Sequence, residues 1–224
     1  MLAGNYSWTY DATEDAEPPQ NQWGLLLVTG NVTVNDKKEE RIYWNDTYGI
    51  PCTLFNQHHD FLTRLIGSGG SGVKTKDGTF VFPVEGTKKE GEAENDGKTK
   101  TVSLIIYSSE DTNWKLSNGT SADGCSDPSV VEWEKDKKLM MMTACDDGRR
   151  RVYESGDKGE SWTEALGTLS RVWGNEHEGP EKGVGSGFIT ATIVGDGDDN
   201  RNVMLVTLPV YTEKREEEKK ESKE

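Results

Sequence analysis

Short apolar runs, each about as long as a β-strand, recur along most of the chain. Turns rich in Asp, Lys and Gly separate these runs, and none of them has the three- and four-residue spacing of an amphipathic helix. The runs span residues 23–34, 41–44, 79–86, 101–108, 129–134, 138–144, 149–155, 188–195 and 202–210. Strands at this spacing predict an all-β fold, either an antiparallel sandwich or a propeller.

An internal repeat favours the propeller. The stretches YSSEDTNW (residues 107–114) and YESGDKGESW (residues 153–162) both follow an apolar run and place small and acidic residues before a tryptophan. The two tryptophans lie 48 residues apart, close to the period of about 40–50 residues that is typical of a four-stranded propeller blade. The first copy is two residues shorter and lacks the glycine, so we interpret it as degenerate.

The stretch SGDKGESW (residues 155–162) predicts a hairpin turn. Asp157 and Gly159 also suit a calcium loop, but such a loop spreads its oxygen ligands over about twelve positions, and here Trp162 follows instead. In a turn, Ser and Asp side chains accept hydrogen bonds from nearby N–H groups, glycine takes a positive φ and the tryptophan packs underneath. We therefore expect a structural role for this stretch.

Three further motifs lack the context that their chemistry needs. Residues 67–72 satisfy G-x-G-x-x-G, but a hairpin follows them in place of a helix N-terminus. Residues 196–200 begin like a calcium loop that lacks its glycine and its final glutamate. His58 and His59 have no further Cys or His at the spacing of a zinc site. We expect neither a metal site nor a cofactor.

Charge and hydropathy narrow the function classes. The chain has 224 residues, and 40 acidic against 26 basic side chains give a net charge of −14, which disfavours nucleic-acid binding. No apolar run reaches the roughly 18 residues that would span a membrane. The first ten residues have no basic start and resemble the end of a strand more than a signal peptide, so we expect an upstream part of a larger protein.

The cysteines and the N-x-[ST] sequons provide information on the cellular compartment of the protein. The three cysteines allow either one disulfide with a free thiol or three buried thiols. Four N-x-[ST] sequons favour a glycoprotein of the secretory pathway, although chance occurrence in an Asn- and Thr-rich chain is the alternative. The sequons begin at Asn5, Asn31, Asn45 and Asn118.

The turn stretch also carries a resemblance to a known family. Ser155, Asp157, Gly159 and Trp162 fit the Asp-box pattern S-x-D-x-G-x-[ST]-W of sialidase-type propellers. Three longer segments extend the match: GCSDPSVVEWE, RRRVYESGDKGESW and EALGTLSRVWG. With them the chain resembles the trypanosomal trans-sialidase superfamily over nearly all of residues 2–211.

The resemblance implies an all-β fold, a partial six-bladed sialidase-type β-propeller made of antiparallel four-stranded blades. Residues 1–211 would form this partial propeller, with Asp boxes near 108–114 and 155–162 that lie away from the active face. Residues 212–224 form a charged, low-complexity tail or loop.

The same resemblance suggests where the chemistry of active relatives has been altered. Asp127 stands where active relatives have the glutamate that activates their tyrosine nucleophile, and its side chain is one methylene shorter; alternatively Asp127 caps a turn. Ala144 marks the position of a lost arginine of the carboxylate-binding cluster, which residues 149–151 do not obviously replace. Tyr6 matches the acceptor-side tyrosine, unless it only packs at a strand end. Glu85 falls where relatives have a glutamine that touches the sugar, and a carboxylate there would repel an anionic sialoside.

We therefore expect a catalytically inactive sialidase-like glycoprotein, at the cell surface or secreted, that adheres to sialylated glycans or to host-cell surface and matrix proteins. The alternative is an active exo-α-sialidase or trans-sialidase once the complete domain is present. A surface antigen or decoy without a ligand is the third possibility. The sequence leaves the ligand, the disulfide state and the occupancy of the sequons open.

Overall fold

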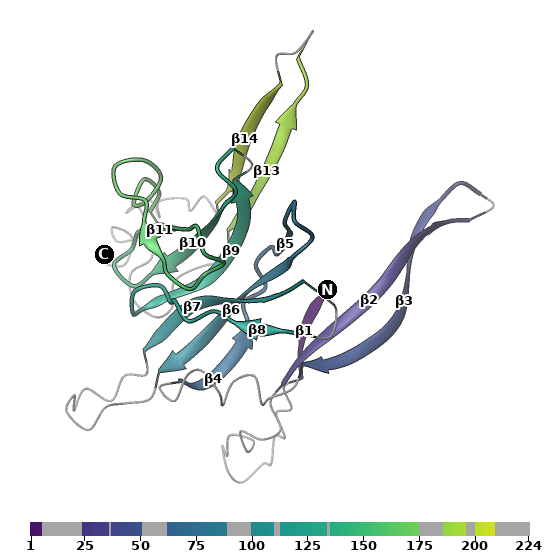
Figure 1. The fold of residues 1–224 in the computed structure, drawn as a ribbon, viewed down its shortest axis with the longest axis horizontal. Coiled ribbons are helices and arrows are strands. Elements are labelled where there is room, and N and C mark those ends of the chain that lie inside the picture. The colour runs from purple at the N-terminus through teal and green to yellow at the C-terminus, as the bar shows by residue number, and fades with distance from the viewer. Residues whose placement is uncertain are drawn as a thin grey trace, which may run out of the picture.

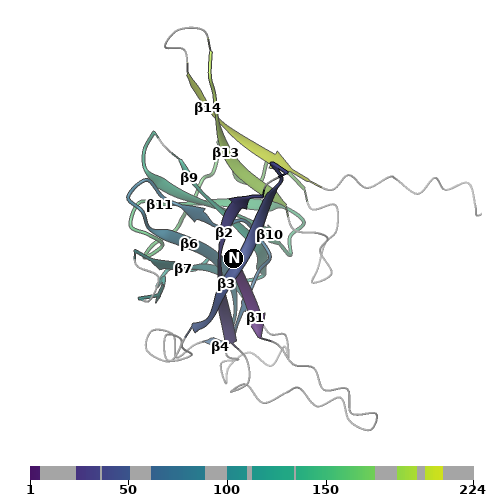
Figure 2. The ribbon, with the colours of Figure 1, turned by 90° about the vertical axis from the view of Figure 1, so that its right-hand side faces the viewer.

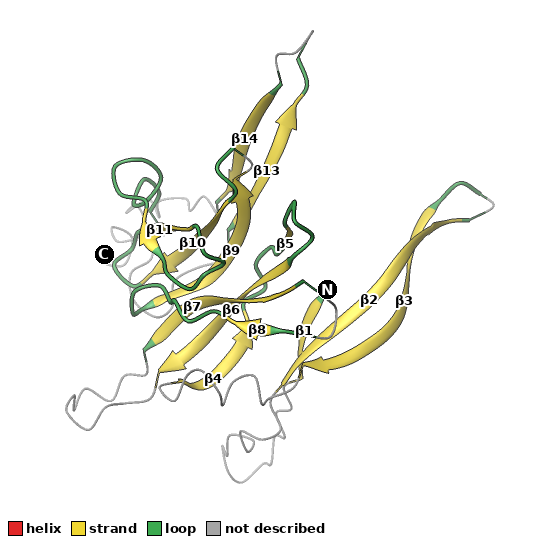
Figure 3. Cartoon of the chain, viewed as in Figure 1, coloured by secondary structure: helices red, strands yellow, loops and turns green. Residues whose placement is uncertain are grey.

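Strands are the only regular secondary structure among the residues that the structure describes (Figure 3). The computed structural model describes residues 1–5, 24–35, 37–50, 62–88, 100–109, 113–133, 135–174, 186–195 and 200–208. Within these ranges no helix has the length and hydropathy needed to cross a membrane. The predicted all-β class is therefore confirmed for the described part of the chain.

The strands form four antiparallel sheets that follow one another along the chain (Figure 1). The first sheet contains β1 (Leu2–Asn5), β2 (Gly24–Val34) and β3 (Glu40–Ile50). The second contains β4 (Leu62–Gly67), β5 (Val73–Lys74), β6 (Phe80–Lys88), β7 (Thr101–Ser108) and β8 (Lys115–Leu116). The third contains β9 (Cys125–Trp133), β10 (Lys138–Cys145), β11 (Arg150–Ser155) and β12 (Thr163–Glu164). The hairpin of β13 (Gly187–Ile193) and β14 (Arg201–Thr207) is the fourth, and it extends away from the body in both views (Figure 1, Figure 2).

Three apolar clusters pack these sheets face to face. Leu25 and Ile50 of the first sheet meet Leu104 of the second. Val81 of the second sheet packs in a further cluster that contains Met141 of the third. The third cluster joins the third sheet to the β13–β14 hairpin and includes Phe188, Met142 and Val152. The two central sheets are thus covered on both faces, which explains why nearly every residue of β7 and β10 is buried instead of every second one.

The internal repeat of the sequence corresponds to a structural repeat. The path β4-β6-β7-β8 in the second sheet matches β9-β10-β11-β12 in the third, and each ends in a two-residue outer strand. The tryptophan of each repeat lies just before that outer strand: Trp114 precedes β8 and Trp162 precedes β12. Trp114 is buried and lies at a tilted angle against Phe82, with 5.7 Å between the ring centroids.

The turn between β11 and β12 is closed by side chains. The Ser155 hydroxyl donates to Asp157 Oδ1 at 2.8 Å and accepts the Gly159 N–H at 2.7 Å. Asp157 also accepts hydrogen bonds from Ser161, at 3.0 Å from its N–H and 2.6 Å from its hydroxyl. Gly159 has a φ of 85°, and a Cβ there would lie 2.8 Å from the Ile105 side chain, so both conformation and packing require glycine.

The turn predicts a pH-dependent contribution to stability. Hydrogen bonds from Ser161 are the main reason that the pKa of Asp157 lies below its ordinary value. A carboxyl group with a depressed folded-state pKa stabilises the fold above its unfolded pKa of about 4, and this contribution is lost as the pH falls further. Replacing Asp157 by Asn should therefore lower the melting temperature by at most about 2–4 °C at pH 7, because the group is exposed. In melting curves this difference should shrink as the pH falls below about 4; a difference that is independent of pH would contradict the assignment.

Candidate functional site

Glu85 and Asp127, which are 42 residues apart in the sequence, meet where the second and third sheets pack together. The Asp127 N–H donates to Glu85 Oε1 at 2.9 Å. Glu85 lies on β6 opposite Ile66 of β4, and Asp127 lies near the start of β9. Both residues are half-buried. The structure thus brings together two of the positions that the sequence singled out.

Asp127 lies in a β-bulge with an unusual backbone. Ser126 pairs with Ala144 and Ser129 pairs with Met142, so two residues of β9 oppose one residue of β10. The φ of Asp127 is 49°, a left-handed conformation that Asp adopts more readily than most residues. Bulges are frequent beside active sites because they redirect a side chain, and backbone outliers cluster at functional sites. The geometry marks this end of β9 as a site candidate.

Ala144 lies next to this bulge and provides no polar group. It pairs with Ser126 on one side and with Arg150 of β11 on the other, and it is 1% exposed. Its side chain is a methyl group that neither donates a hydrogen bond nor carries charge. The positive charge that the resemblance implies at this position is therefore missing from residue 144.

The three arginines that follow Ala144 in the chain, at residues 149–151, lie in different surroundings. Arg150 is 1% exposed, and its Nη1 donates to the Ser186 hydroxyl at 3.1 Å. Arg151 lies on the opposite face of β11 and pairs with Asp147 at 2.6 Å. Arg149 is exposed and forms a backbone bridge to Gly174. Whether this run replaces the arginine that the resemblance implies at position 144 stays a prediction.

The glycine-rich segment at residues 67–72 packs against the start of β9. The Ser68 hydroxyl donates to the carbonyl of Pro128 at 3.1 Å, and the Val130 N–H donates to the carbonyl of Ser71 at 3.0 Å. A Cβ at Gly70 would lie 1.8 Å from the Pro128 oxygen. Gly70 must be a glycine because two backbones approach closely at this point, which the sequence analysis did not predict.

A disulfide joins the two strands that carry Asp127 and Ala144. Cys125 and Cys145 are bonded and form a register pair between β9 and β10. Both are almost fully buried. The pairing that the sequence left open is therefore decided for these two cysteines, and Cys52 lies outside the described residues.

Arg64 is a residue near this site that the sequence analysis missed. It lies on β4 opposite Thr87, and because Ile66 opposes Glu85, Arg64 and Glu85 share one face of the second sheet. Arg64 is half-buried. No run of apolar residues predicted β4, so nothing in the pattern pointed to this arginine.

The closed turn at residues 155–162 lies at the other end of the third sheet. Leu139 at the start of β10 pairs with Ser155, whereas Ala144 near its end pairs with Arg150. Five residues of a strand cover about 17 Å. This turn therefore cannot contact a ligand that is held between Glu85 and Asp127.

Several predicted positions are only partly described. Tyr6, His58 and His59 lie outside the described residues, and the side chain of Asn5 is not described. The other three sequon residues are exposed: Asn31, Asn45 and Asn118. Asn118 donates its amide to Glu160 of the closed turn. Glycosylation of the four sequons remains a prediction. The boundary between the partial propeller and the charged tail at residue 211 remains one as well.

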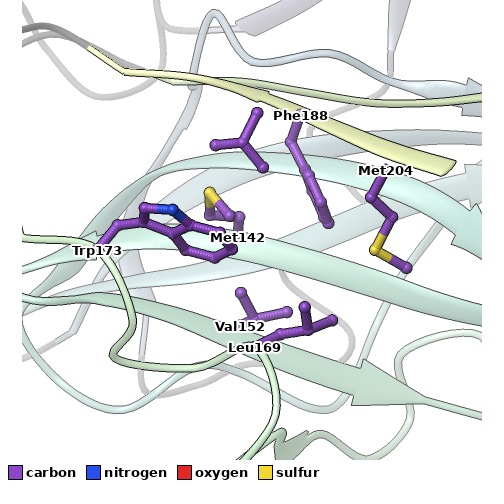
Figure 4. A pocket seen from close by; sticks show the side chains of 7 residues that line it. Met142, Val152, Leu169, Trp173, Phe188 and Met204 are labelled. Atoms are coloured by element: carbon purple, nitrogen blue, oxygen red, sulfur yellow. The ribbon is translucent and has the colours of Figure 1, made fainter.

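An apolar cavity of about 120 Å³ lies between the third sheet and the β13–β14 hairpin (Figure 4). Its lining residues are Met142, Val152, Leu169, Trp173, Phe188, Met204 and Val206. These side chains converge on the cavity from the third sheet, from the loop after β12 and from the hairpin (Figure 4). Because the lining is almost wholly apolar, this cavity is unsuited to a sugar and reflects incomplete packing between sheets.

Comparison with known proteins places this arrangement in a family. The family model described as BNR repeat-like domain matches residues 1–224. The chain belongs to this family. Within it, the chain is 34% identical over 218 residues to a sialidase of Trypanosoma cruzi and 38% identical over 215 residues to sialidase 85-1.1 of the same organism. These matches cover 94% and 92% of the chain but only 17% and 25% of the two relatives.

Solved structures to which the chain is similar confirm the fold. The structure of Trypanosoma rangeli sialidase in complex with sialic acid matches with a TM-score of 0.74 and 32% identity, over 93% of the chain and 32% of the sialidase. A mutant of the same sialidase that displays trans-sialidase activity matches with a TM-score of 0.70 and 31% identity, over 92% and 31% of the two chains. The predicted partial sialidase-type β-propeller and the resemblance to the sialidase and trans-sialidase family are confirmed. The chain spans about a third of these solved structures.

Proposed function

We propose that the protein containing this chain is a sialidase-like glycoprotein, at the cell surface or secreted, that binds sialylated glycans and has little or no sialidase turnover. Host-cell surface or matrix proteins that carry such glycans are the partners that this proposal implies. The proposal concerns the whole protein, of which the chain supplies one part of the site.

The observation that carries the proposal is the methyl group of Ala144, which pairs in register with Ser126 next to the bulge at Asp127. In this position the resemblance to active relatives predicts an arginine that grips the carboxylate of sialic acid. A hydrogen bond to a charged group contributes about 1.5–3 kcal/mol, and removal of one catalytic electrostatic donor typically lowers the rate about 10²–10³-fold. Arg150 cannot compensate, because it is buried and held by Ser186.

The charge of Glu85 and the shorter side chain of Asp127 also favour low sialidase turnover. A carboxylate at Glu85 repels an anionic sialoside where a neutral amide would not. Asp127 withdraws its carboxylate by about one bond length relative to glutamate, and a misplacement of about 1 Å can lower the rate about 10²-fold. Binding through sugar hydroxyls is less sensitive to the shorter side chain at position 127 than catalysis is, because catalysis needs tighter geometry in the transition state.

Two features support the proposed localisation. The Cys125–Cys145 disulfide suits an oxidising compartment, because disulfides are rare in the cytosol. Asn31, Asn45 and Asn118 are exposed, as an acceptor of an N-glycan must be.

The decisive experiment measures turnover of a fluorogenic sialoside by the longest natural protein that contains this chain. We expect a rate at least about 10²–10³-fold below that of Trypanosoma rangeli sialidase measured in parallel, because Ala144 provides no charged donor for the sialic acid carboxylate. A double variant, Ala144→Arg with Asp127→Glu, should regain part of the rate if the site is a decayed sialidase site. Its melting curve must be recorded as well, because Ala144 is buried.

Glycan binding by the same protein tests the adhesive half of the proposal. We expect binding to sialylated glycans and weaker binding to the same glycans after removal of sialic acid. Turnover comparable to the active control would overturn the proposal in favour of an active enzyme. Absence of binding to any glycan or host-cell extract by the folded protein would favour an antigen or decoy without a ligand.

A further inference from the structure

The β-bulge of β9 needs hydrogen-bond partners from outside its own sheet. Asp127 and Pro128 are the two residues of β9 that have no register partner on β10. Proline lacks an N–H, so the only backbone donor of the bulge is the N–H of Asp127. Asp127 is half-buried, and a backbone N–H that is shielded from water is costly unless an acceptor reaches it. The acceptor that binds this N–H therefore contributes to the stability of the bulge.

The second sheet and the segment that follows β4 supply the partners. Oε1 of Glu85, on β6, accepts the N–H of Asp127 at 2.9 Å. The Ser68 hydroxyl donates to the carbonyl of Pro128 at 3.1 Å. An ionised carboxylate is a stronger acceptor than a neutral oxygen, so the bond to Glu85 is the stronger of the two.

These two bonds restrict the backbone at Asp127. Its φ of 49° is a left-handed conformation, which Asp tolerates but which costs free energy in an L residue. One bond holds the peptide group before the Cα atom of Asp127, and the other holds the peptide group after Pro128, whose own φ is fixed by its ring. Few torsions therefore remain that could move the Asp127 side chain. Loss of the acceptor at residue 85 would release the end that adjoins Asp127.

We propose that Glu85 is a positioning residue, which acts through Asp127 by holding the bulge and so fixing where the Asp127 carboxylate lies. This role differs from the one that the resemblance implies for position 85, where relatives have a glutamine that touches the sugar. The expected effect on glycan binding rests on the proposed function, because that function makes Asp127 part of the glycan site. The hydrogen bond and its effect on the bulge do not depend on it.

Amide hydrogen exchange, measured by NMR on the full chain, tests this role without a ligand. Glu85→Gln and Glu85→Leu both remove the negative charge, but only glutamine keeps an oxygen that can accept the Asp127 N–H. We expect this amide to exchange about tenfold faster or more in Glu85→Leu than in Glu85→Gln, because an amide without its acceptor opens more readily. Glu85→Ala lacks the acceptor and adds no bulk, so it should give the same acceleration if leucine is not tolerated.

Glu154→Leu is the matched control for these variants. Glu154 is a half-buried glutamate of the third sheet that accepts a hydrogen bond from Lys138 at 3.0 Å, and it lies on β11, away from the bulge. Its replacement should leave the exchange of the Asp127 amide unchanged. Acceleration in this control equal to that in Glu85→Leu would overturn the proposal, because any lost glutamate would then have the same effect.

Binding of sialyllactose by the longest natural protein that contains this chain tests the consequence for the site. Well below both melting temperatures, Glu85→Leu should bind about tenfold more weakly than Glu85→Gln, because the two variants share the same charge and differ in the acceptor. The proposal is overturned if the Asp127 amide exchanges equally in both variants, or if it stays protected in Glu85→Leu while binding falls, which would make Glu85 a sugar contact. If the amide responds as expected but the parent protein binds no sialyllactose, the positioning of Asp127 by Glu85 stands and the proposed function fails.

Discussion

Replacing Gly70 by Ala should destabilise the fold by about 3 kcal/mol or more, at the upper end of what overpacking costs. The added Cβ would lie 1.8 Å from the Pro128 oxygen and 2.8 Å from the Ser129 hydroxyl oxygen. The closest of these atoms is a backbone carbonyl, which cannot rotate away as the end of a long side chain can. The melting temperature of a chain of this size should then fall by about 6–12 °C.

Gly67→Ala is the matched control in the same segment. A Cβ at Gly67 meets nothing within 4 Å, so this variant should melt within a few degrees of the parent chain. If both variants melted alike, the close approach of the glycine-rich segment to β9 would not exist. If only Gly70→Ala were destabilised, its binding of glycans should also be impaired, because Pro128 directly follows Asp127 in the bulge.

Removing the Cys125–Cys145 disulfide should have the second large effect. The bond closes a loop with a sequence separation of 20, and loss of this constraint on the unfolded chain is worth about 3 kcal/mol in the chain-entropy model. The double variant Cys125→Ala, Cys145→Ala should therefore melt well below the oxidised parent chain. Alanine suits the test because both cysteines are buried and a serine would add an unsatisfied hydroxyl group.

Reduction provides the internal control for this comparison. A reductant present during unfolding should lower the melting temperature of the parent chain towards that of the double variant, and should leave the double variant unchanged. Insensitivity of the parent chain to the reductant, with the double variant equally stable, would contradict a structural role for the bond. Because β9 and β10 carry Asp127 and Ala144, loss of the bond should also loosen the candidate site.

The sequence predicted the strands best where packing on both faces makes them apolar. The runs that became β7 and β10 were recognised because they are rich in apolar residues. The structure shows the reason, since nearly every position in these two strands is buried. The strand β4 was missed because LTRLIG mixes an arginine with apolar residues at an edge, and the two-residue strands β5, β8 and β12 are too short to have a pattern. The second half of β3 was missed for a similar reason, since most of its described side chains are exposed.

In the candidate site, the sequence indicated individual residues, whereas the contacts between them came from the structure. Residue types at Glu85, Asp127 and Ala144 could be singled out from the resemblance, but no spacing predicts that Glu85 accepts the N–H of Asp127. The bulge at Asp127 and the burial of Arg150 likewise depend on the pairing of β9 with β10 and of β10 with β11.

By itself the sequence determined the all-β class, the repeat that ends in Trp114 and Trp162, and the family to which the chain belongs. These features are local, because alternation, turn residues and a short motif act within one or two strands. The tertiary structure alone decided which cysteines pair, which arginine is buried, why Gly70 must be glycine and that Glu85 accepts the N–H of Asp127. Each of these depends on the distance between strands that are remote in the chain, and that distance is set by how the sheets pack face to face.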